Sequence, residues 1–222
     1  MGEILTRENA MTAIKDDFLA TARAAANLLR DPAVAAAWDK PSALAEFRVS
    51  GLAGHLAYQI LIISRILNSP VPEEPTISLL DHYGRAEWIG KSVDDDFNVR
   101  IREGGEQVAA DGPEALAALV DATVEELSDG LPRAENRPVR VPLWGPWSLL
   151  LDDLLVTRMM ELAVHSDDLA VSVGVPTPPI PATAVDTVVD LLSRLAVRRH
   201  GATNVLRAFS RAERAPAGIA AF

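Results

Sequence analysis

The sequence predicts an all-α protein, a bundle of four main helices with additional short helices. Two segments carry most of this prediction, residues 49–67 and 147–173, because both are long, free of proline and apolar on most faces. Aromatic residues make up only 5% of the chain, while alanine, leucine and valine are abundant, a composition that favours closely packed helices. Strand-like alternation is weak and confined to residues 137–143, where Pro142 disfavours a central strand.

The first main helix is expected over residues 6–29. Thr6 is a suitable N-cap, and Asp31–Pro32 stops the helix because proline cannot continue it. Apolar side chains recur at helical spacing, at Ile14, Phe18, Ala22, Ala25, Leu28 and Leu29.

The second main helix is expected over residues 49–67, after a broken segment. Ser50 caps it or a turn at Gly51 precedes it, and the proline-containing residues 68–72 end it. The segment is apolar all round except for a few polar side chains in or next to it, Arg48, His55, Gln59, Ser64 and Arg65.

The remaining helices are predicted from the same periodicity. They cover residues 78–88, 94–110, 113–127, 147–173, 182–199 and 203–214. Pro113 suits a first helical turn, Gly130 closes that helix, and the four prolines of residues 175–181 make a stiff connector. We expect residues 1–222 to form a single domain, with helices from about residue 182 to residue 214 appended to the bundle.

The composition excludes several classes of partner and of functional site. The net charge of −10 argues against nucleic acid and anionic membranes as partners. The chain has no cysteine, which excludes disulfides, iron–sulfur clusters, thiolate metal sites and a cysteine nucleophile. No signal peptide or uninterrupted membrane span is apparent, and a loose myristoylation pattern at residues 1–6 is discounted. The sequence therefore predicts a cytoplasmic protein, and a homodimer is left open.

A polar stripe interrupts the apolar helix at residues 147–173. Glu161 and His165 are four residues apart, so they share one helix face, and Asp168 lies close to that face. Together with His55 from a facing helix they could supply imidazole and carboxylate ligands for a divalent metal. The alternative is a solvated stripe with an Arg158–Glu161 ion pair and a buried His55 of structural role. Spacing alone does not separate these interpretations.

Other conspicuous side chains have weaker claims. Trp144 and Trp147 could line a cleft mouth, although packing is the expected role. His82 is expected at the surface. The basic cluster Arg198, Arg199 and His200 near a helix end is expected to complement the helix dipole, the alternative being to bind carboxylates of a thiol cofactor or its substrate.

Three segments resemble a known family. Residues 49–56, VSGLAGHL, resemble the first-ligand helix of the DinB superfamily, in particular its mycothiol-dependent maleylpyruvate isomerase branch. Residues 157–170, TRMMELAVHSDDLA, are similar to the second signature of that branch, TR-x-x-E-x-x-x-H-x-x-D-L-A. Residues 198–208 resemble the end of these domains. The resemblance implies a DinB-like four-helix bundle, with His55, Glu161 and His165 as metal ligands and Asp168 as an acidic residue of the active site.

The resemblance also implies an activity. It indicates a metal-dependent enzyme that uses a low-molecular-weight thiol such as mycothiol against an electrophilic small molecule, by thiol transfer or cis–trans isomerisation. Zinc is the expected metal, with nickel, iron or manganese as alternatives. Residues 47–50 depart from the usual first signature, and the additional C-terminal domain of the isomerase is absent, so we expect a substrate other than maleylpyruvate. The alternatives are a non-catalytic metal-binding or regulatory module and a metal-dependent hydrolase.

Overall fold

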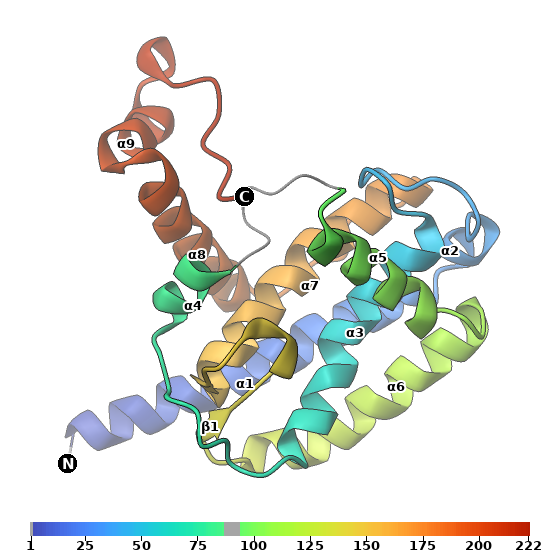
Figure 1. The fold of residues 1–222 in the computed structure, drawn as a ribbon, viewed down its shortest axis with the longest axis horizontal. Coiled ribbons are helices and arrows are strands. Elements are labelled where there is room, and N and C mark those ends of the chain that lie inside the picture. The colour runs from blue at the N-terminus through green and yellow to red at the C-terminus, as the bar shows by residue number, and fades with distance from the viewer. Residues whose placement is uncertain (1, 87–93) are drawn as a thin grey trace.

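Four long helices form the body of the protein. The computed structural model describes residues 2–86 and 94–222. The bundle consists of α1 (Gly2–Leu29), α3 (Val49–Leu67), α6 (Pro113–Gly130) and α7 (Leu151–Val173). Both α1 and α3 pack against α6 and α7 (Figure 1). This arrangement confirms the predicted all-α, DinB-like bundle.

Helix α3 supplies much of the core. Its side chains meet those of α7 and α1 in one cluster, whose fully buried members include Leu52, Leu56, Ile60, Ile63, Leu154, Leu155, Met159 and Phe18. Burying a side chain of this size contributes about 1.5–3 kcal/mol. Within the described residues, α3 alone is long and apolar enough to cross a membrane, but 72% of that stretch is buried inside the protein. Its apolar character is therefore accounted for by the core.

Short helices complete the N-terminal half, and two of them have side-chain caps at the ends that the sequence suggests. Ser78 caps α4 (Leu79–Arg85) and Asp95 caps α5 (Asp96–Val108), close to their predicted starts. The expected end of the first of these helices at residue 88 lies outside the described residues. A further helix, α2 (Pro32–Ala36), was not predicted; the Asp31 carboxylate accepts a hydrogen bond from its backbone.

Helix α5 crosses α3 at very short range. A Cβ atom placed on Gly54 would lie 2.0 Å from the backbone oxygen of Gly105, and one placed on Gly105 would lie 2.3 Å from the backbone oxygen of Gly51. Only residues without a side chain allow this approach. Ser50 strengthens the crossing by donating a hydrogen bond of 2.9 Å to Glu106 on α5.

Several predicted helix boundaries were wrong. Helix α1 begins at Gly2, so Thr6 is not its N-cap. Helix α3 is preceded by Arg48, and Ser50 lies inside it rather than capping it. Helix α6 runs through Gly130, whose φ of −86° is not the left-handed value of a closing glycine, into the 3₁₀ turn η1 (Leu131–Arg133).

The start of α7 was also predicted too early. Residues 149–150 form β2 (Leu149–Leu150), which pairs antiparallel with β1 (Pro138–Val139). Within the described parts of the chain, these two strands form the only sheet, and the other strand-like contacts are isolated bridges. Between the two strands lies the 3₁₀ turn η2 (Pro142–Trp144), so the predicted extended segment is shorter than expected.

The last helices extend from one end of the bundle. Helix α8 (Ala182–His200) packs against α7, α1 and α4, and Arg198 in its last turn donates a 2.6 Å hydrogen bond to the backbone oxygen of Leu80. Helix α9 (Ala202–Ser210) ends earlier than predicted and is followed by the 3₁₀ turn η3 (Ala212–Arg214). Figure 1 shows both helices projecting away from the four-helix body.

Candidate metal centre

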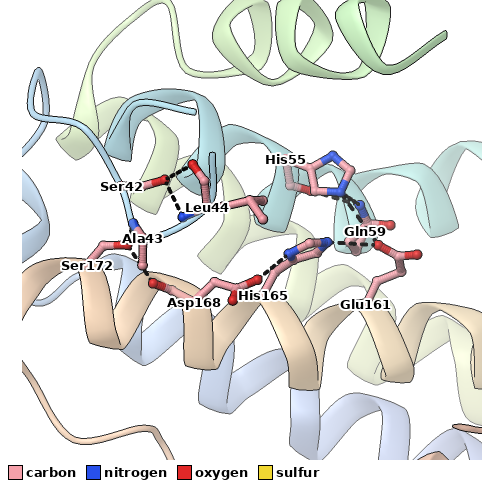
Figure 2. Close-up of polar contacts among 9 residues, drawn as sticks. All are labelled: Ser42, Ala43, Leu44, His55, Gln59, Glu161, His165, Asp168 and Ser172. Carbon is pink, nitrogen blue, oxygen red and sulfur yellow. Dashed lines mark hydrogen bonds and ion pairs between the residues drawn. The ribbon is translucent and has the colours of Figure 1, made fainter. Parts of the chain in front are cut away.

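Helices α3 and α7 bring three side chains with metal-ligating atoms to one place. The Nε2 atom of His165 lies 3.1 Å from Oε2 of Glu161, and Nε2 of His55 lies 3.5 Å from the same oxygen. The two imidazole rings are nearly perpendicular, at 82°, with centroids 4.8 Å apart. Figure 2 shows the rings and the carboxylate converging from the two helices. Glu161 and His165, which share a polar stripe on α7, thus meet His55 of the facing helix α3.

The distances and donor types suit a divalent cation. One donor atom from each residue can be chosen so that all three lie within 4.8 Å of one another. Two donors that each lie about 2.0–2.2 Å from a tetrahedral ion are themselves separated by roughly 3.2–3.6 Å. The measured separations between each histidine and Glu161, 3.1 and 3.5 Å, are close to this range. Two imidazoles and one carboxylate also leave a coordination position for an exogenous ligand.

Asp168 orients the His165 ring. Its Oδ2 lies 2.9 Å from Nδ1 of His165, so Nδ1 carries the proton and Nε2 is directed toward Glu161 and His55 (Figure 2). The backbone oxygen of Asp168 accepts a 2.6 Å hydrogen bond from Ser172, whose hydroxyl in turn accepts one of 2.8 Å from the backbone of Ala43. The loop before α3 is thereby attached to α7 beside the site.

Gln59 and Arg158 connect His55 to α7 through hydrogen bonds. The amide nitrogen of Gln59 donates a 2.9 Å hydrogen bond to the His55 backbone oxygen and lies 3.3 Å from Nε2 of its ring. The amide oxygen of Gln59 accepts a hydrogen bond from the buried Arg158 guanidinium, which also donates to Thr157. The Arg158–Glu161 ion pair of the alternative interpretation is replaced by this contact with Gln59.

Burial and mutual contacts set the charges of the cluster. The side chains of His55, Glu161 and His165 are 14%, 15% and 16% exposed. Burial would raise the pKa of Glu161, but hydrogen bonds from the two histidines hold that pKa well below its usual range. Burial opposes protonation of His165, but hydrogen bonds to Asp168 and Glu161 outweigh it and raise the pKa of His165 to about 9.

His55 behaves differently. Burial is the largest influence and lowers its pKa, and the neighbouring His165 lowers it further, while Glu161 acts in the opposite direction. The metal-free cluster at neutral pH therefore holds a neutral His55, a protonated His165 and an ionised Glu161. Binding a cation at Nε2 of His165 then requires loss of one proton.

A cavity of about 650 Å³ opens next to His55. Its wall is formed by parts of α3 and α5 and by the loop around η2, including Trp144 and Trp147. Both interpretations of these tryptophans hold, because they line the cavity and also pack, Trp144 against the core cluster and Trp147 as a buried side chain with 8% of its surface exposed. Trp144 additionally stacks on Arg158, whose guanidinium carbon lies 4.9 Å from the ring centroid.

A comparison with family models decides the relationship of the chain to known proteins. The model described as the mycothiol maleylpyruvate isomerase N-terminal domain matches residues 18–170, which include all four predicted site residues. The chain belongs to this family. No curated protein and no solved structure gave a significant match. The family resemblance predicted from the two signatures is confirmed.

The predicted exposure of His82, a residue that lines the cavity, was wrong. His82 was expected at the surface, but only 4% of it is exposed. Its Nδ1 accepts a 3.2 Å hydrogen bond from Trp147, and its ring centroid lies 4.3 Å from that of Trp144, with the rings tilted by 43°. Burial, with a smaller contribution from Arg158, lowers the pKa of His82 to about 4, so it is neutral at physiological pH. The sequence around His82 gives no signal of this burial, which depends on the distant Trp144 and Trp147.

Proposed function

We propose that this member of the family is a metal-dependent enzyme that uses a small thiol, with mycothiol as the first candidate, as a nucleophile toward an electrophilic small molecule. The observation that carries the proposal is the position of His55, which belongs both to the His–Glu–His cluster and to the wall of the 650 Å³ cavity. A ligand in the cavity would therefore lie next to the cluster. The chain has no cysteine, so the thiol has to come from outside.

In this proposal His55, Glu161 and His165 hold the metal. Nitrogen and oxygen donors without sulfur suit zinc, with nickel, iron and manganese as alternatives. Asp168 keeps the proton on Nδ1 of His165, which leaves Nε2 available as a ligand. Gln59 and Arg158 position His55 through the hydrogen bonds described above.

A divalent cation at this position would favour ionisation of a thiol at neutral pH. The thiol loses its proton to solvent. Its sulfur then bonds to the electrophilic carbon, while the π electron pair of the double bond moves from that carbon to the adjacent atom. In thiol transfer to an activated double bond, that adjacent carbon then takes a proton from water. In isomerisation, rotation about the former double bond precedes expulsion of the same thiol. The burial of the cluster limits competing attack by water.

The test begins with metal content. Purified protein is expected to contain about one equivalent of metal per chain, and Glu161→Ala and His165→Ala are expected to lose it. His200→Ala is the matched control, because His200 lies in α8 and contacts the backbone of Ala220. Full metal occupancy in Glu161→Ala would contradict the assignment of ligands.

Activity is then measured as thiol disappearance with a panel of thiols and electrophiles, for metal-loaded and chelator-stripped protein. Only the loaded protein is expected to accelerate the reaction, and only when thiol is present. Turnover that needs metal but no thiol would favour the hydrolase alternative. Stoichiometric metal with equal rates for loaded and stripped protein in every pair would favour the non-catalytic binding module.

The proposal includes the setting of the enzyme. We propose that residues 1–222 act as one domain, with α8 and α9 attached to the bundle, and that the enzyme works in the cytoplasm on small molecules. The net charge of −10 disfavours nucleic acid and anionic membranes as partners. A mass measurement in solution would separate a monomer from the homodimer that the sequence leaves open.

A further inference from the structure

The cavity beside His55 is lined mainly by apolar and aromatic side chains. They come from α3, α5 and the loop around η2 and include Tyr58, Leu61, Phe97, Ile101, Leu143 and Trp144. Its volume of about 650 Å³ is in the ordinary range for a small-molecule site. A compact, strongly hydrated ligand would lose water in this cavity without gaining enough polar contacts.

Two apolar side chains of this wall remain exposed to solvent. Leu143 is 74% exposed and Leu119 is 50% exposed, and both line the cavity. Large apolar side chains gathered at the mouth of a cavity are typical of a site that an apolar ligand covers. They indicate that the ligand extends from the cluster to the cavity mouth.

The charged side chains of the wall that the structure describes have one sign. Arg65 of α3 and Arg100 of α5 line the cavity, and none of its lining residues in the described parts of the chain is an aspartate or glutamate. The two arginines can therefore accept a negative group of a bound ligand.

We propose that this cavity binds the electrophile, and that the electrophile is an apolar, ring-containing molecule carrying a negatively charged group. The apolar ring occupies the space between Phe97, Trp144 and Leu143, and the anionic group contacts Arg65 or Arg100. The inference rests on the proposed function for the role of this molecule as a substrate, and it adds the class to which the substrate belongs. This substrate class differs from the compact dicarboxylates, which lack an apolar ring.

Binding of unreactive probes to metal-free protein tests the class without requiring catalysis. The probes are 4-succinimidobenzoate, N-phenylsuccinimide and succinate. The first is aromatic and anionic, the second is aromatic and neutral, and the third is a compact dianion. All three lack the reactive double bond of the corresponding electrophile. Affinity is measured by calorimetry, supported by quenching of Trp144 and Trp147. The expected order is 4-succinimidobenzoate, then N-phenylsuccinimide roughly tenfold weaker, then succinate weakest. Any other order overturns the proposal.

Variants locate the binding. Leu143→Glu is expected to weaken both aromatic probes at least about tenfold, because it places a carboxylate at the apolar mouth. Leu206→Glu is the matched control, since Leu206 is 66% exposed on α9 and does not line the cavity. Equal affinity of Leu143→Glu and the control protein for both probes would overturn the location.

The arginines are tested by charge selectivity. Arg65→Gln combined with Arg100→Gln should abolish the advantage of the anionic probe over the neutral one and leave the neutral affinity unchanged. Both side chains are exposed, so the replacements leave the core intact. Retention of the full advantage in the double variant would overturn the role of the arginines. Failure of the proposed function appears separately, as absent metal or absent thiol-dependent turnover in protein that still binds the probes in the expected order.

Discussion

The Nδ1 atom of His165 lies 2.9 Å from the Oδ2 atom of Asp168, on the opposite side of the ring from the nitrogen that faces Glu161. This contact selects one of the two tautomers and fixes the direction of the ring. Residues 161, 165 and 168 lie on successive turns of α7, so one helix supplies two of the candidate metal ligands and the residue that orients one of them.

Replacing Asp168 by asparagine should weaken metal binding without abolishing it. The amide retains the shape of the side chain but no longer favours the Nδ1–H tautomer or the ligand strength of His165, so we expect a loss of about 10–100-fold in metal affinity or in rate. Asp167→Asn is the matched control, because Asp167 is exposed and accepts a hydrogen bond from Thr177 instead. Titration with zinc in competition with a chelator measures the affinities. Equal affinities for the two variants would contradict the orienting role.

Metal affinity should rise with pH until about pH 9. Although burial opposes it, hydrogen bonding to Asp168 and Glu161 raises the pKa of His165 in the metal-free protein to about 9. Below that pH the cation must displace the His165 proton, so the apparent affinity should increase about tenfold per pH unit between pH 6.5 and pH 8.5. His55 adds no second proton in this range, because its pKa is lowered.

The check is calorimetry of metal binding in buffers with different ionisation enthalpies. About one proton per chain should be released at pH 7.5, and fewer in Asp168→Asn, because loss of the carboxylate lowers the pKa of His165. Binding without proton release from the wild-type protein would show that His165 is already neutral and would contradict this electrostatic description.

The bundle could be predicted from the sequence because its signals are local. Residues 49–67 were predicted as a helix with the observed bounds, since an apolar run between Arg48 and the proline-containing residues 68–72 specifies both ends. The four-residue spacing of Glu161 and His165 likewise placed them on one face of α7. The facing position of His55 required the family resemblance as well, because helix periodicity does not say which helices become neighbours.

Features that depend on distant contacts were not predictable in this way. Leu149 and Leu150 continue the apolar pattern of α7, and only pairing with Pro138 and Val139 makes them a strand. His82 is buried because Trp144 and Trp147, more than 60 residues later, cover it. No local pattern records either contact. The contact of Gly54 with Gly105 is similar, since a glycine within a helix does not identify the helix that approaches it.

His82 should make the protein sensitive to mild acid. Burial and Arg158 lower its pKa to about 4 in the folded protein, whereas an unfolded chain binds the proton near pH 6.5. Stability contributed by neutral His82 is therefore complete above about pH 6.5 and is lost progressively as the pH falls toward 4, by up to about 3 kcal/mol.

His82→Gln removes the titrating group and keeps an acceptor for Trp147. Urea unfolding of chelator-treated protein, at several pH values from 7 to 4, measures the free energy of unfolding. The difference between wild type and variant should shrink or reverse as the pH falls, because only the wild-type protein loses this contribution. A constant difference over the whole range would mean that His82 does not titrate as described.

The crossing of α3 and α5 gives a test that compares adjacent glycines in the same helix. Gly105→Ala would place a methyl group 2.3 Å from the backbone oxygen of Gly51 and 3.3 Å from the backbone nitrogen of His55, so α5 must move away from α3. Overpacking of this kind typically costs about 1–3 kcal/mol. Because His55 lies at the same contact, the variant should also bind metal more weakly.

Gly104→Ala is the control. A Cβ atom at Gly104 meets nothing within 4 Å, and alanine is a better helix former than glycine, so this variant should gain roughly 0.5–1 kcal/mol in its free energy of unfolding. Thermal unfolding of the metal-free proteins and zinc titration of the folded ones provide the measurements. Opposite shifts in stability for the two neighbouring positions, with weakened metal binding only in Gly105→Ala, are the expected result. Similar shifts in the free energy of unfolding for both variants would contradict the close approach of α5 to α3 at Gly51.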